Sequence, residues 1–82
     1  MIMVEIYFAE MNRSYDFRLE ENVPVSQVIE DVVGKIAQME RIPVGKDPGL
    51  FILCGKGHKR IFDRGATLVQ NGVRSGDEIM LI

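Results

Sequence analysis

The sequence predicts an α+β domain in which a mixed five-stranded sheet packs on one long α-helix, in the order ββαββ(short helix)β. Three observations lead to this fold class. Apolar residues alternate with a period of two near both ends of the chain, they recur with a helical period in the middle, and glycines and prolines punctuate the second half. The 82 residues are 46% hydrophobic and 27% charged, so we expect one small core and a single domain over residues 1–82.

The N-terminal part of the chain is expected to form a β-hairpin. Residues 2–8, IMVEIYF, place apolar side chains at even positions, and residues 14–19, SYDFRL, place them at odd positions. The polar segment 10–13 between them is short enough for a tight connection. The two strands should therefore pair antiparallel, with these apolar residues in one core.

One long helix should follow Pro24, a residue suited to a helix start because its missing N–H is not needed there. From Val25 the apolar residues fall at the spacing of a single helical face. Gly34 lies in the middle of the pattern, where it lowers helix propensity, and suggests close packing against a neighbouring element. The predicted face comprises Val25, Val28, Ile29, Val32, Ile36 and Met39.

The second half of the chain reads as short strands separated by turns. The first and last strands of this layout should be central and parallel neighbours, with Ile2, Val4, Ile6, Ile79 and Leu81 pointing inward. The expected elements are a loop over residues 41–49, a strand over 50–54, a short fourth strand over 59–62, a short helical turn over 67–72 and a last strand over 78–82.

Composition limits the classes of partner and location. The net charge is −2, with eight acids and three bases in residues 1–40 and four acids and seven bases in residues 41–82, which argues against non-specific nucleic-acid binding. A single cysteine, Cys54, forms no internal disulfide and fits a reducing, cytoplasmic setting. No apolar run approaches the roughly 20 residues that span a bilayer, so we expect no membrane insertion.

Several stretches of the sequence resemble the ubiquitin-like β-grasp fold over nearly the whole chain. They are RIP after the helix, LFILCGK in the third strand, DRGATL before the helical turn and VRSGDEIMLI at the end. The texts NRSYDFRL, PVSQVIEDV and IFDRGATLVQNGVRSGDEIMLI are most similar to the YukD/EsaB-type proteins of Gram-positive bacteria. Those proteins accompany type VII (ESX-like) secretion systems.

The resemblance implies a non-enzymatic, cytoplasmic accessory or regulatory protein without a cofactor, whose partner is a secretion-system protein. The sequence ends at Ile82 without the Gly-Gly tail of ubiquitin, so we expect no conjugation. Two other functions stay open. One is the ubiquitin-like subunit of a bacterial multicomponent monooxygenase, which is also a binding module, and the other is a modifier or sulfur carrier.

The candidate docking site is an apolar patch on the outer face of the sheet. Period-two alternation places the residues of this patch on the opposite face of the strands from the core residues Phe51, Leu53 and Leu81. In ubiquitin the corresponding positions form the main partner-binding patch, and the resemblance assigns its two aliphatic members to Ile52 and Ile82. The alternative is a set of scattered surface aliphatics, which need no partner. The predicted patch comprises Ile52, Met80, Ile82 and Leu50.

The loop CGKGHKR is the densest basic stretch and a candidate contact for an acidic partner or a phosphate. It opens a strand rather than a helix, so it is no P-loop, and a solvated hairpin turn is the simpler interpretation. Cys54 and His58 could face each other across it, but one histidine without an orienting group is a poor basis for a catalytic dyad or a zinc site. The basic residues of the loop are Lys56, His58, Lys59 and Arg60.

Overall fold

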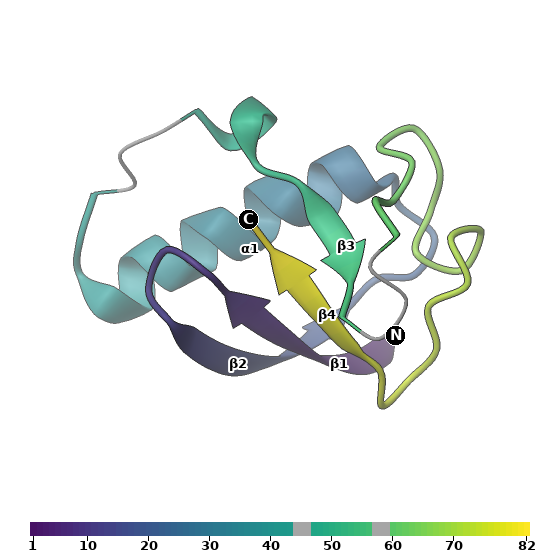
Figure 1. Ribbon diagram of the computed structural model, residues 1–82, viewed down its shortest axis with the longest axis horizontal. Helices are drawn as coiled ribbons and strands as arrows, with labels where there is room; N and C mark the ends of the chain where they lie inside the picture. The colour runs from purple at the N-terminus through teal and green to yellow at the C-terminus, as the bar shows by residue number, and fades with distance from the viewer. Residues whose placement is uncertain (44–46, 57–59) are drawn as a thin grey trace.

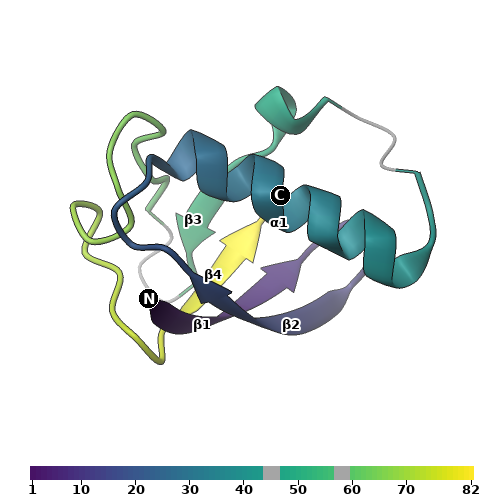
Figure 2. The ribbon, with the colours of Figure 1, turned by 180° about the vertical axis from the view of Figure 1, so that it is seen from behind.

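One sheet and one long helix form two layers in the computed structural model, which describes residues 1–43, 47–56 and 60–82. The helix crosses one face of the sheet, lying behind it in Figure 1 and in front of it in Figure 2. None of the described helices lies on the opposite face. The elements are β1 (Ile2–Phe8), β2 (Arg13–Leu19), α1 (Val25–Glu40), the 3₁₀ turn η1 (Pro48–Leu50), β3 (Leu53–Gly55) and β4 (Glu78–Leu81).

The sheet has the strand order β2-β1-β4-β3. β1 and β2 form the expected antiparallel hairpin, and β1 pairs in parallel with β4 in the centre of the sheet. β3 pairs antiparallel with the other edge of β4. The prediction that the first and last strands are central, parallel neighbours is therefore confirmed.

The prediction of a fifth strand over residues 59–62 is wrong, because the described residues form four strands. Ile61 makes only an isolated bridge to Cys54, and Phe62 then turns into the core. Two backbone hydrogen bonds flank this bridge, from the Phe62 amide to the Leu53 carbonyl at 2.9 Å and from the Gly55 amide to the Arg60 carbonyl at 3.0 Å. The pairing extends no further within the described residues, and the Arg60 guanidinium donates to the carbonyl oxygen of Asn71. Lys59, the predicted first residue of the strand, lies outside the described residues.

The third strand begins later than predicted, at Leu53 instead of Leu50. The preceding residues form η1, where Pro48 suits the first helical position and the Asp47 side chain accepts a hydrogen bond from the Gly49 amide at 2.8 Å. This local capping competes successfully with strand pairing. Ile52 nevertheless pairs with Ile82, the residue that follows β4.

The predicted helical turn over residues 67–72 is a run of hydrogen-bonded turns rather than a helix. Thr67 Oγ1 accepts from the Gln70 amide at 3.1 Å, and Gln70 Oε1 accepts from the Thr67 amide at 2.9 Å, which is a capping box. Asn71 is the buried polar residue here, and its side chain bonds the backbones of Asp63 and Thr67. Gly72 adopts the expected positive φ, 85°.

α1 buries the predicted face except at its C-terminal end. Met39 is exposed, and Val33 is buried beside the predicted residues. The last turn is held instead by polar contacts, because Glu40 accepts from Arg13 at 2.9 Å and from the Tyr15 hydroxyl at 2.8 Å. The hydrogen bond from Tyr15 lowers the pKa of Glu40.

The interpretation of Gly34 as a close-packing residue is wrong. A Cβ atom added at this position would meet no heavy atom within 4 Å, and the glycine faces solvent. Its helix-weakening effect has no structural compensation in the described residues.

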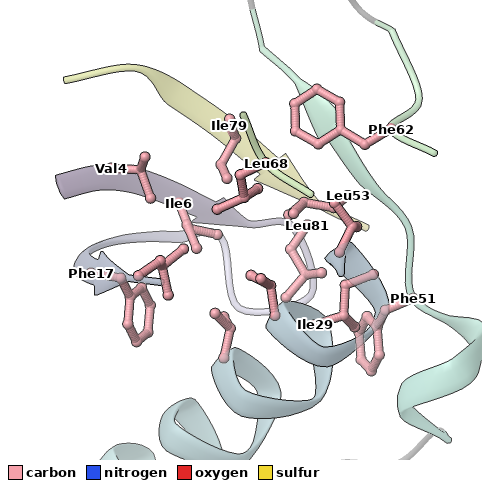
Figure 3. Packing of buried hydrophobic residues seen from close by; sticks show 14 of the residues in the cluster. Val4, Ile6, Phe17, Ile29, Phe51, Leu53, Phe62, Leu68, Ile79 and Leu81 are labelled. Carbon is pink, nitrogen blue, oxygen red and sulfur yellow. The ribbon is translucent and has the colours of Figure 1, made fainter. Parts of the chain in front are cut away.

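The core lies between the sheet and α1. In Figure 3, Ile6 and Leu81 point from the two central strands toward the helix that carries Ile29. These three residues are fully buried, as are Phe51, between η1 and β3, and Leu68, in the turns over residues 67–72. Of the predicted inward residues, Ile2 is only partly buried and packs at the margin of this cluster. The core thus fixes which face of β3 and β4 remains outside.

Candidate functional site

The candidate site is the outer face of the sheet, the face turned away from α1. Ile52 and Ile82 lie directly opposite each other, because the amide of each donates to the carbonyl of the other, at 2.7 and 2.9 Å. Met80 pairs with Cys54 two residues further along the same two strands. Since the intervening residue Leu81 is buried, Ile52, Met80 and Ile82 share the outer face.

Leu50 lies outside this paired block. It is the last residue of η1, two residues before Ile52, and it is 66% exposed. Its side chain is therefore available to a partner, but no strand pairing fixes it beside the other predicted patch residues.

Two residues that the sequence analysis did not select extend the apolar surface across the sheet. Tyr7 of β1 pairs with Met80, and Ile61 bridges to Cys54 and is 64% exposed. A row therefore runs from Tyr7 through Met80 and Cys54 to Ile61. The odd position of Tyr7 in β1 was a usable signal, whereas the bridge of Ile61 depends on contacts that no sequence pattern shows.

We call Tyr7, Ile52, Ile61, Met80 and Ile82 the outer patch. Ile52 and Ile82 are 37% and 40% exposed, and Tyr7 and Met80 are partly buried by their neighbours. Contiguous exposed apolar side chains mark interaction sites more often than scattered ones do. A domain this small needs most of its apolar residues for its core, so a group of them on the surface is a candidate protein-binding site.

Cys54 lies in the same row, with its side chain turned away from solvent. It is buried, and its thiol donates to the carbonyl oxygen of Met80 at 3.6 Å. Burial raises the pKa of Cys54, so the nucleophilic thiolate form is disfavoured. His58, which the sequence sets across the loop from Cys54, lies outside the described residues.

Alkylation of Cys54 in the native protein is expected to be at least about a hundredfold slower than in denaturant, because reaction requires opening of the fold. The measurement is the rate of iodoacetamide labelling by mass spectrometry, and the unfolded protein supplies the reference rate for the same thiol. Native labelling as fast as in denaturant would contradict the buried placement and would revive a nucleophilic role.

The structure describes two of the four residues of the predicted basic contact loop. Lys56 forms an ion pair with Glu78 at 3.2 Å, and Arg60 donates to the backbone of Asn71. Both described cations are thus engaged within the domain. The other two members, His58 and Lys59, lie outside the described residues.

The described part of the chain offers neither a cluster of metal ligands nor a membrane-spanning helix. Across residues 1–43, 47–56 and 60–82, no three or more His, Cys, Asp or Glu side chains are grouped so that they could hold a metal ion. Among the described helices, none has both the length and the apolar composition needed to cross a membrane.

The sequence matches one protein-family model over residues 2–81. That model is described as "WXG100 protein secretion system (Wss), protein YukD". No curated protein matches the chain.

Solved structures show the ubiquitin-like fold. The structure of ATBAG1 in complex with HSP70 is 20% identical with a TM-score of 0.73, and it covers 100% of this chain. The chain spans only 40% of that protein's length. A ubiquitin from Caldiarchaeum subterraneum is 26% identical with a TM-score of 0.66, covering 99% of this chain and 90% of its own.

A third structure is the N-terminal ubiquitin-like domain of the 4931431F19Rik protein. It is 18% identical with a TM-score of 0.70, and the match covers 99% of this chain and 72% of that one. Together these likenesses show a ubiquitin-like α+β fold with a mixed sheet and one helix.

Proposed function

The chain belongs to the YukD family of the WXG100 protein secretion system, and from this premise we propose that it is a non-enzymatic module that binds another protein of that system in the cytoplasm. The family match over residues 2–81 is the observation that carries the proposal. The family match favours a secretion role over a role as a monooxygenase subunit. The sequence pattern alone left both roles open.

The proposed docking surface is the outer patch, with Leu50 as a peripheral contact. Burying exposed apolar surface contributes about 25 cal/mol per Å². Met80 adds an adaptable side chain at the centre of the patch, between Tyr7 and Cys54 in the row across the sheet. The geometry supports binding because the patch lies on a sheet face that none of the described helices covers (Figure 1).

Three observations support a role without catalysis. The Cys54 thiol is buried, the described cations Lys56 and Arg60 are engaged by neighbouring groups, and the patch itself is apolar. A single unpaired cysteine is also typical of proteins in a reducing compartment, which supports the cytoplasmic location.

Deleting the gene in its native host is expected to remove WXG100 proteins from the culture supernatant, because the proposed module serves their secretion. The measurement is quantitative mass spectrometry of supernatant and cells, with restoration by the wild-type gene. A protein exported by the general secretory pathway is the control and should be unaffected. Normal WXG100 secretion in the deletion strain would overturn the proposed function.

A further inference from the structure

Three carboxylates lie side by side across the outer face of the sheet. Glu5 of β1 pairs with Asp16 of β2 and also with Glu78 of β4. The three strands are neighbours in the sheet, so the acidic side chains form one row. We call Asp16, Glu5 and Glu78 the carboxylate row.

The carboxylate row borders the outer patch. Tyr7 and Met80 follow Glu5 and Glu78 by two residues in β1 and β4, so they point to the same face. Two residues along a strand correspond to about 7 Å. The outer face therefore changes from the outer patch to the carboxylate row over about 7 Å, with the Lys56 ammonium over the Tyr7 ring and against Glu78 at the boundary.

Most of the negative charge of the row is not neutralised within the domain. In the described ranges, no ion pair reaches Glu5 or Asp16, whereas Glu78 pairs with Lys56 at 3.2 Å. Three carboxylates against one ammonium leave a net charge of −2. Arg18 lies on the same face two residues from Asp16 along β2, opposite Met3, and in the described ranges it forms no ion pair with the row.

The register places like charges next to one another. Like charges directly opposite each other in a sheet are destabilising, and Glu5 has an acidic neighbour on both sides. The row also lines a shallow depression of about 200 Å³ together with Met3 and Gly76, so the carboxylates surround a common space. A cationic group placed there would relieve the repulsion.

We propose that the outer patch and the carboxylate row form one docking surface for an amphipathic, basic helix of the partner protein. The inference rests on the proposed function and adds the chemistry of the partner. Four residues of a helix span about 6 Å, which matches the spacing of about 7 Å between the patch and the row. A helix lying along β1 and β4 therefore places apolar side chains on the patch and Lys or Arg, about one turn away, over the row.

The charge of the row selects a protein helix rather than a membrane surface. An anionic lipid surface is repelled by a net negative row, whereas a basic helix is attracted and oriented by it. The effect of such rim charges falls as salt rises, because ions screen exposed pairs.

Two variants that remove the same number of charges test the inference. Glu5→Gln with Asp16→Asn neutralises the row, and Glu30→Gln with Asp31→Asn does the same on the exposed side of α1. The probes are a synthetic helical peptide with a leucine ridge bordered by lysines, and a second peptide with glutamates in place of the lysines. Binding is followed by NMR titration at low and high salt, and by sedimentation with vesicles rich in anionic lipid.

We expect the lysine peptide to shift resonances of the outer patch and the row, with binding about tenfold weaker in the row variant at low salt and unchanged in the α1 variant. The glutamate peptide and the vesicles should not bind. The row variant should also unfold at a higher denaturant concentration than the wild type, since it loses the like-charge repulsion.

Equal binding of the two peptides, no binding of the lysine peptide, shifts on α1, or binding to the vesicles would each overturn the inference. A separate outcome distinguishes it from the proposed function. If the row variant restores secretion in the deletion strain and captures its partner as well as the wild type does, while Ile52→Asp with Met80→Asp does neither, the docking module stands and the basic-helix partner is wrong.

Discussion

Replacing Ile52 and Met80 together by aspartate is expected to weaken binding of the secretion-system partner by at least about a hundredfold. Both side chains point away from the core, so the fold should survive the change. The loss has two causes. Two apolar contacts disappear, and two charges must be desolvated wherever the partner covers them.

The measurement is recovery of a secretion-system component with the tagged protein from cross-linked host cells, compared between wild type and variant. Val69→Asp with Met39→Asp is the matched control, because it introduces the same charges at exposed apolar positions outside the outer face. Circular dichroism checks that both variants fold. Ile52→Lys with Ile82→Lys provides a second test should the first variant unfold. Recovery equal to the wild type in a folded patch variant would exclude the patch as the docking surface.

The elements that sequence periodicity could predict are those with long, regular patterns. The alternation in residues 2–8 and 14–19 specifies both strands of the hairpin, and the helical spacing from Val25 specifies α1. The parallel pairing of β1 with β4 followed from the order of elements, since a single helix has to cover one face of a mixed sheet.

The segments that could not be predicted depend on individual contacts, many of them made by side chains. Residues 60–62 alternate like a strand, and backbone hydrogen bonds join Arg60 and Phe62 to β3, but the pairing is limited to the single bridge of Ile61. The side chains of Arg60 and the buried Asn71 bond the neighbouring turns instead. η1 likewise replaces the start of the third strand because Asp47 caps it locally. Such contacts join residues that carry no shared periodic signal.

The same distinction separates the two halves of the candidate site. Alternation alone places Ile52, Met80 and Ile82 on the outer face, because each is next to a core residue in the sequence. The carboxylate row depends on the register between strands, which sets Glu5 beside both Asp16 and Glu78. Register arises from the packed core as a whole and is invisible in any one segment.

Leu81→Ala is expected to lower the free energy of unfolding by about 3–4 kcal/mol. Leu81 is fully buried at the centre of the sheet, paired with Phe8 on one side and Leu53 on the other, so truncation leaves a cavity that three packed strands cannot close. A domain of this size has a total stability of roughly 4–12 kcal/mol, so the variant should be marginal.

Urea unfolding followed by circular dichroism measures this loss, with Ile82→Ala as the control. Ile82 is the next residue along the chain but lies on the outer face, so its truncation should cost less than about 1 kcal/mol. Equal destabilisation by the two substitutions would show that the faces are not separated as described. We therefore expect the two neighbouring residues to have different roles. Leu81 is needed for the domain to fold, whereas Ile82 is needed for it to hold its partner.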